Sequence, residues 1–320
     1  MVKYTFLLPA YKAFYFADAL RSIKEQTYSD FYCVVSDDCS PNDLWTIFRK
    51  EVGDDDRFIY RRNVKNIGGT DLTEHWNLLL QECRTEYFIL ASDDDVYDCR
   101  FLEDLNGYTE KYSNVNLFRG RVKYIDENGE TLEVETLFEE RETQMSFLFK
   151  MYNTNFIHCI GNYIFKTKFI KDINGFIDFP LAWFSDDATI LRAAETGTVC
   201  SNEILFSFRV SDYNISNIKS DKGKNKLKVK ASQLYYYWYR DYLTEFVFSH
   251  TKENDLLFTK ARKGCIERIN SMITSYSCGL GFIHLFDIFI WRSRNDLFDG
   301  IRERVCYWWC LFTELKSLMK

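Results

Sequence analysis

The sequence has only three prolines in 320 residues. That scarcity argues against proline-rich linkers and favours continuous packed elements. The longest apolar stretch, residues 281–291, is interrupted by His284 and Asp287 and falls short of the roughly 20 residues needed to span a bilayer. The ten cysteines include no CxxC pair, so neither a zinc cage nor a thioredoxin-like redox site is predicted.

We also expect no cleavable leader. Residues 4–8 form an apolar run of strand length, with no small-residue cleavage site behind it. We therefore expect a cytoplasmic protein whose thiols are reduced. Peripheral contact with the inner face of the cell membrane is a further expectation, which depends on the C-terminal residues.

Charge is divided unevenly along the chain, and aromatic residues are abundant at 18%. Residues 222–320 carry 17 Lys and Arg against 10 Asp and Glu, whereas residues 1–221 carry 24 against 37. An acidic N-terminal part and a basic, aromatic C-terminal part predict two units with different roles, residues 1–220 and residues 221–320. The apolar share of 46% excludes wholesale disorder.

Strand and helix patterns alternate over the first 120 residues. This order predicts an α/β fold, Rossmann-like, with a mostly parallel sheet, helices on both faces and right-handed crossovers. The predicted strands are 4–8, 30–36, 57–61 and 87–91, and the predicted helices are 16–26, 42–52, 72–83 and 100–112.

The pattern after residue 112 is mixed. A polar, basic stretch at 220–230 reads as a link, and the helices that follow it form the C-terminal extension. We predict strands at 115–118, 122–125, 131–134 and 163–166, and helices at 145–152, 185–194, 234–248, 255–276 and 299–318.

Carboxylates follow two of the predicted strands. Asp37 and Asp38 end the second strand, and Asp93, Asp94 and Asp95 end the fourth. Ligands bind at the carboxyl edge of an open parallel sheet, and oxygen ligands of this kind suit Mg²⁺ or Mn²⁺. The alternative is a solvated acidic loop, which is how we interpret residues 54–56.

Several motifs in fixed order make residues 3–216 similar to glycosyltransferase family two, a large family of inverting enzymes with the GT-A fold. The matching segments are 7–12 (LLPAYK), 22–27 (SIKEQT), 30–40 (DFYCVVSDDCS), 66–69 (NIGG), Asn77 and 86–95 (EYFILASDDD). The family often has Asp where this chain has Ser92, but the D-x-D pattern is met by residues 93–95.

The resemblance implies a nucleotide-sugar site. In the family pattern, Asp38 reads the nucleotide base, Pro9 and Tyr11 pack under it, and Asp93 lies near the ribose. Asp94 matches the metal-binding aspartate, with Asp95 beside it as a second ligand. A bound Mn²⁺ or Mg²⁺ would stabilise the charge that develops on the departing nucleoside diphosphate. No P-loop or GxGxxG motif offers a competing phosphate cradle.

A second acidic pair, Asp186 and Asp187, opens the predicted helix at 185–194. The resemblance implies that Asp187 is the catalytic base and that Asp186 orients or contacts the acceptor; residues 175–178 (GFID) match the family's approach to this pair. A carboxylate base and one direct displacement imply inversion at the anomeric carbon. The alternative is that Ser185 or Asp186 merely caps the helix.

Three positions are weaker candidates, because the chain departs from the family pattern around them. His75 would replace a basic residue missing from the helix before Asn77, or be structural. His158 aligns with the acceptor side, or packs in the core. Arg209 is a candidate for the diphosphate, since Ser211 and Asp212 occupy the stretch where many relatives have a metal-binding His.

Together the residues and the resemblance predict an inverting glycosyltransferase with a GT-A catalytic domain at 1–220 and a helical extension at 221–320. The expected partners are a UDP-linked sugar and a glycan or lipid-linked acceptor, in bacterial polysaccharide assembly, with no nucleic acid. The alternatives are an inactive sugar-nucleotide-binding subunit and a sugar nucleotidyltransferase. Aromatic clusters at 235–238 and 307–309 suit either a membrane interface or packing on the catalytic domain or a partner chain.

Overall fold

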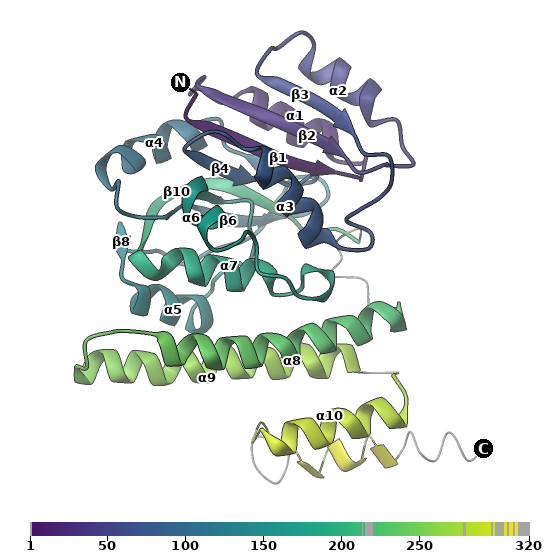
Figure 1. Ribbon diagram of the computed structural model, residues 1–320, viewed down its shortest axis with the longest axis vertical. Helices are drawn as coiled ribbons and strands as arrows, with labels where there is room; N and C mark the ends of the chain where they lie inside the picture. Colours follow the sequence, from purple (N-terminus) through teal and green to yellow (C-terminus); the bar gives the residue numbers. More distant parts are fainter. Residues whose placement is uncertain are drawn as a thin grey trace.

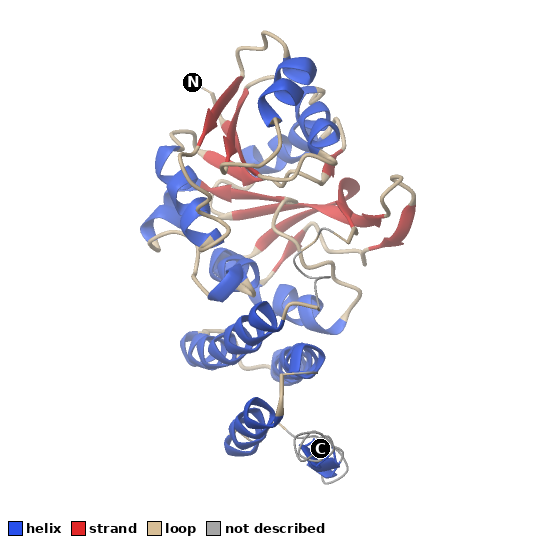
Figure 2. Cartoon of the chain, turned by 90° about the vertical axis from the view of Figure 1, so that its right-hand side faces the viewer, coloured by secondary structure: helices blue, strands red, loops and turns tan. Residues whose placement is uncertain are grey.

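The structure is a computed structural model (Figure 1). It describes residues 2–212, 214, 220–277, 280–295, 297, 304–305, 307–309 and 311–312. Within these ranges an α/β unit is followed by a helical C-terminal part. Figure 2 shows the helices of that part stacked as a separate layer beyond the sheet.

The strands and helices follow the predicted order, with several additions. The strands are β1 Tyr4–Ala10, β2 Phe31–Asp37, β3 Phe58–Arg62, β4 Tyr87–Leu90, β5 Val96–Tyr97, β6 Leu117–Ile125, β7 Thr131–Val134, β8 Arg141–Glu142, β9 Tyr163–Lys166 and β10 Thr198–Arg209. The helices are α1 Phe16–Lys24, α2 Leu44–Val52, α3 Leu72–Glu82, α4 Phe101–Lys111, α5 Gln144–Asn153, α6 Thr167–Asp172, α7 Ser185–Ala193, α8 Lys222–Glu245, α9 Lys252–Ser277 and α10 Phe282–Arg294, with short 3-10 turns η1 Pro180–Ala182 and η2 Ala194–Thr196.

One sheet contains all the strands, in the order β3-β2-β1-β4-β9-β6-β10-β5, with β7 on β6 and β8 on β10. The pairs β1–β2, β1–β4, β2–β3 and β6–β10 are parallel, and β9 is antiparallel to both β4 and β6. The mostly parallel sheet is thus confirmed. The chain leaves β1 toward β2 and returns on its other side as β4, so the carboxyl ends of β1 and β4 form a switch point.

Helices cover both faces, because each helix presents an apolar stripe to the sheet. The buried residues Phe16, Leu20 and Ile23 of α1 join those of α2 and α4 in one core. The other core contains Trp76 and Leu79 of α3 together with residues of α5, α7, α8 and α9. Helices α8 and α9 run side by side beneath α5 and α7 (Figure 1).

Some observed elements differ from the predictions, and one prediction falls largely outside the described residues. The supposed link at 220–230 is helical, because α8 begins at Lys222, where Asp221 caps it by accepting a bond from the Lys224 N–H at 3.0 Å. The strands predicted at 115–118 and 122–125 are one strand, β6. Strand β10 and helix α10 were not predicted. Most of the helix predicted at 299–318 lies outside the described residues.

None of the helices in the described ranges has both the length and the apolar character that crossing a bilayer requires.

Candidate active site

A pocket of about 410 Å³ lies at the switch point, at the carboxyl ends of β1 and β4. Four predicted nucleotide-site residues line it: Pro9, Tyr11, Asp38 and Asp93. His75 lines it as well, together with Gly68, Gly69, Ile160 and Lys224. The parallel register explains why residues so far apart in the sequence meet here, since Ala10 pairs with Asp37 and Leu7 with Leu90.

Asp38 is held by the loop that follows β3. Its carboxylate accepts hydrogen bonds from the backbone of Ile67 at 2.9 Å and Gly68 at 2.7 Å, and from the Asn63 amide at 2.8 Å. A Cβ at Gly68 would lie 3.1 Å from the Asp38 carboxylate, so only glycine lets the backbone approach this closely without a shift. The NIGG segment therefore fixes Asp38 in the pocket wall.

The acidic loop after β4 is satisfied by donors from several elements. Asp93 accepts from the backbone N–H groups of Tyr11 and Lys12, both at 2.7 Å. The Lys12 ammonium lies 3.2 Å from Asp93 and also pairs with Asp94. These donors balance part of the repulsion that three adjacent carboxylates would otherwise suffer.

Asp95 differs from the other two because both of its oxygens accept hydrogen bonds. One accepts from the Ser92 hydroxyl and the other from the backbone N–H of Arg209 at 2.9 Å. Burial, reinforced by the charge of Asp94, raises the pKa of Asp95 to about 8. Each Asp95 oxygen thus already accepts one hydrogen bond, and its role as a metal ligand stays a prediction.

A divalent ion fits only a site shared with substrate. Among the described residues there is no group of three His, Cys, Asp or Glu that could hold a metal. Asp94 accepts from Lys12 through one oxygen only. Mg²⁺ and Mn²⁺ are often held by one or two carboxylates plus substrate phosphates, so Asp94 and a bound diphosphate together suit such an ion.

Arg209 is buried and its guanidinium is fully committed to protein. It donates to the backbone carbonyls of Asp94 at 3.0 Å and Glu127 at 3.1 Å, and pairs with Asp18 at 3.2 Å. The ring of Tyr15 stacks against it, 4.3 Å away. The expected contact of Arg209 with a diphosphate is therefore not supported, since this side chain fixes the acidic loop instead.

His75 is buried beside Asp38 and hydrogen-bonds the Ser36 hydroxyl at 2.9 Å. Burial lowers its pKa, which favours the neutral ring at neutral pH. A neutral imidazole does not replace the missing basic residue as a cation.

The second acidic pair opens α7 after an unusual turn. Leu181, Ala182 and Phe184 all have positive φ, at 61°, 53° and 70°. Strain of this kind in non-glycine residues persists only where the surroundings enforce it, and it gathers at functional sites. The N-cap residue is Phe184 and makes no side-chain cap bond. The helix-cap alternative for Ser185 or Asp186 is therefore wrong.

Asp187 is buried and held from both sides. One oxygen meets His158 Nδ1 at 2.8 Å, and the other pairs with Arg268 of α9. Burial opposes ionisation of Asp187, but the charges of Arg268 and His158 outweigh it and lower the pKa to about 2. His158 thus lies beside the pair, and its place on the acceptor side stays a prediction.

Asp186 has the opposite environment. Burial and the adjacent charge of Asp187 raise its pKa to about 7, and its carboxylate accepts from the Asp187 N–H at 2.9 Å. Burial, and then charges that include those of Asp95 and Asp186, raise the pKa of the Cys159 thiol well above its usual value. Cys159 immediately precedes Ile160, which lines the pocket.

Three cationic residues of the site were missed from the sequence. Lys12 lies inside the quoted LLPAYK motif, so its place beside Asp93 could have been anticipated. Arg268 and Lys224 belong to the helical part, where no local motif marks them.

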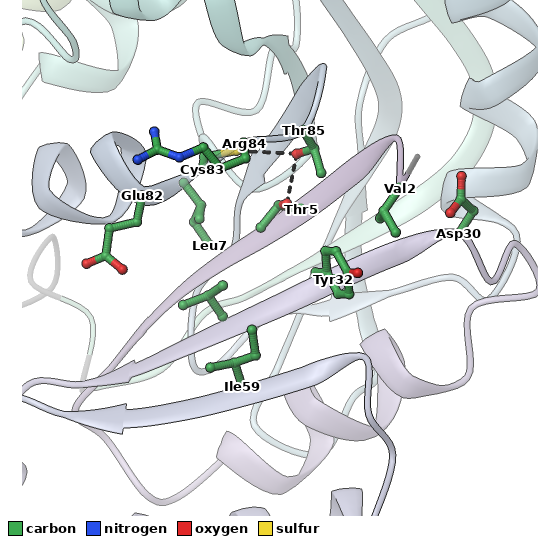
Figure 3. Close-up of a pocket in the computed structure, with 11 residues that line it drawn as sticks. Val2, Thr5, Leu7, Asp30, Tyr32, Ile59, Glu82, Cys83, Arg84 and Thr85 are labelled. Carbon is green, nitrogen blue, oxygen red and sulfur yellow. Dashed lines mark hydrogen bonds between the residues drawn. The ribbon is translucent and has the colours of Figure 1, made fainter.

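Another cavity, of about 560 Å³, lies along β1, β2 and β3 (Figure 3). It contains none of the predicted site residues. Thr5 and Thr85 in its wall hydrogen-bond each other at 2.8 Å, so these polar groups satisfy one another.

Solved structures with a similar fold are GT-A glycosyltransferases. S. aureus TarS residues 1–349, in complex with UDP-GlcNAc, has a TM-score of 0.55 and 16% identity, covering 85% of this chain and 84% of that chain. The mannosyltransferase PcManGT from Pyrobaculum calidifontis, in complex with GDP-Man and Mn²⁺, has a TM-score of 0.54 and 13% identity, covering 86% and 73%. The GT-A fold with a helical C-terminal part is confirmed.

The family follows from the sequence comparison. The model of glycosyl transferase family 2 matches residues 5–173, and the chain belongs to this family of transferase enzymes. An uncharacterized glycosyltransferase, MJ1057 of Methanocaldococcus jannaschii, is 24% identical over 161 residues, which are 50% of this chain and 53% of the relative. The chain thus spans about half the length of this curated relative.

Proposed function

We propose that this enzyme transfers a sugar from a UDP-linked donor to a hydroxyl of a glycan or lipid-linked acceptor, with inversion. The observation that carries the proposal is the pocket joining Asp38 to Asp93, with Asp94 following in the chain. The UDP-GlcNAc and GDP-Man complexes of the similar structures support a nucleotide-sugar donor. A ligand that binds only the native state raises the melting temperature, so a panel of nucleotide sugars with Mn²⁺ tests the donor.

The donor would bind with its base against Pro9, Tyr11 and Asp38 and its ribose near Asp93. Asp94 would hold Mn²⁺ or Mg²⁺ together with the diphosphate, and the ion would stabilise the negative charge of the leaving group. Lys12 holds the two aspartates in place from the other side.

Asp187 would act as the base for the acceptor hydroxyl. A carboxylate with a pKa near 2 is a weak base. It nevertheless suffices, because the acceptor oxygen becomes strongly acidic as it bonds to an oxocarbenium-like carbon. Asp186, with its higher pKa, would orient the acceptor.

The two alternatives remain distinguishable. An inactive sugar-nucleotide-binding subunit would bind the donor without turning it over. Detectable hydrolysis of the donor by the pure protein, even at a low rate, would therefore argue against an inactive subunit. A nucleotidyltransferase would need a glycine- and lysine-rich loop after β1, which residues 9–16 lack. A role in bacterial polysaccharide assembly stays a prediction that the identity of the acceptor would test.

Replacing Arg268 by Met should move the acid limb of the pH–turnover profile to higher pH. The charge of Arg268 lowers the pKa of Asp187; without it the folded-state pKa rises, and the ionised base is lost at a higher pH as acid is added. Arg268→Lys should keep the profile close to the wild type. Arg262→Met, an exposed site on the same helix, is the control. A profile unchanged by Arg268→Met would contradict this role.

Membrane contact through the C-terminal residues also stays a prediction. Trp308, Trp309 and Phe312 are exposed, whereas Tyr235 of the first aromatic cluster is buried and stacks on Phe184 at 4.4 Å. If the exposed aromatics contact lipid, the protein should sediment with anionic vesicles at low salt and dissociate as salt rises. Absence of sedimentation at low salt would remove this contact.

A further inference from the structure

Lys224 brings a positive charge from the helical part into the donor pocket. It lies in the first turn of α8, is half-buried, and lines the pocket with Tyr11 and Asp93. Helix α8 is rigidly placed, because Tyr235 and Tyr239 are buried against the catalytic unit and Tyr235 stacks on Phe184. The pocket wall is therefore built from both parts of the chain.

The other basic groups around the pocket are already committed. Lys12 pairs with Asp93 and Asp94, and Arg209 pairs with Asp18 and backbone carbonyls. His75 is a buried ring whose pKa is lowered by burial. Across the described part of the chain, the Lys224 ammonium makes no ion pair with a carboxylate; its backbone N–H donates to the Asp221 cap.

An incoming diphosphate would meet an unfavourable balance of charge. Asp93 and Asp94 are opposed by the single ammonium of Lys12, so the loop is net negative before any phosphate arrives. Like charges at close range destabilise binding unless another cation intervenes. Lys224, which lines the same pocket, is a point charge of the kind that proteins use for phosphate.

We propose that Lys224 binds the diphosphate of the nucleotide-sugar donor, so that the helical part completes the donor site. The proposal rests on the proposed function, because it assumes a nucleoside diphosphate in this pocket. It also gives the helical part a role in donor binding, since α8 positions a ligand-binding side chain.

The test compares two ligands that differ only in phosphate. Binding of UDP and of uridine would be measured by calorimetry for the wild type, Lys224→Ala and Lys224→Gln. We expect Lys224→Ala to weaken UDP about tenfold, equivalent to ~1.4 kcal/mol, with uridine unchanged. The loss should shrink as salt rises. Lys226→Ala, an exposed lysine two residues away that does not line the pocket, should bind UDP like the wild type.

The outcomes separate this inference from the function it rests on. UDP affinity unchanged in both Lys224 variants, or an equal loss for UDP and uridine, would overturn the role of Lys224 and leave the donor assignment intact. A wild type that does not bind UDP would overturn both. Melting temperatures of the variants would show whether any loss reflects unfolding, and Lys224→Gln keeps most of the side chain's packing if Lys224→Ala destabilises the helix.

Discussion

Replacing Asp187 by Asn should lower the catalytic constant by ~10²–10⁴-fold, the usual contribution of a general base. Asn keeps the size of Asp and can still meet His158 or Arg268, but it cannot take a proton. The donor dissociation constant should change by only a few-fold, because the interaction lost belongs to the transition state. Turnover and nucleotide binding should be measured on the same preparation.

The neighbouring carboxylates supply the comparisons. Asp186→Asn should lose less turnover than Asp187→Asn if Asp186 only orients the acceptor. Asp172→Asn removes an exposed carboxylate at the end of α6 and should behave as the wild type. Turnover of the Asp187 variant within a few-fold of the wild type would mean that the base lies elsewhere, and Asp186 would be the next residue to test.

Much of the fold could be predicted because its signals are local. Each strand of the first half is a short apolar run and each helix has an apolar stripe. The order of these segments and the spacing of their apolar residues were therefore enough to predict the strands and helices. Strand β10 was missed because its apolar run is broken by exposed residues at 202–204, where the register with β6 also shifts. The start of α8 was missed because its lysines read as a solvated link.

The first turns of α8 show why sequence pattern failed there. Asn225, Lys228, Val229 and Ser232 are buried, so the inward face of this segment is largely polar. Lys228 lies over the rings of Trp183 and Tyr276, at 4.9 and 4.2 Å. A polar stripe that packs on aromatic rings has no distinctive period of apolar residues, and only the tertiary fold reveals it.

The site residues also differ in whether the sequence alone could place them. Asp38 and Asp93 could be placed in one pocket because strand ends meet at one sheet edge. The charged partner of Asp187 could not, because Arg268 is 81 residues away on a helix with no motif. The role of Arg209 was hard to predict for a related reason. Its charge was visible in the sequence, but two of the carbonyls that accept its hydrogen bonds belong to a separate turn at 126–127.

Replacing Asp94 by Asn should remove the effect of Mn²⁺ on donor binding. In the wild type, affinity for UDP should rise when Mn²⁺ replaces EDTA, because Asp94 and the diphosphate would hold the ion together. In the variant the two affinities should be nearly equal, and transfer should fall by about 10²–10³-fold, as when one preorganised electrostatic group is lost. The fold should survive, because one of three crowded negative charges is removed and Lys12 still pairs with Asp93.

The control for this prediction is another aspartate in an acidic triplet. Asp54 lies in the loop at 54–56, is exposed and pairs with Arg49 at 3.1 Å. Asp54→Asn should keep both the Mn²⁺ response and transfer. If Asp94→Asn kept the full Mn²⁺ response, the ion would be held by groups other than Asp94, and the proposed metal role of Asp94 would be wrong. Because UDP binding in EDTA should depend on Lys224 but not on the ion, measuring each variant with and without Mn²⁺ separates the two sources of positive charge.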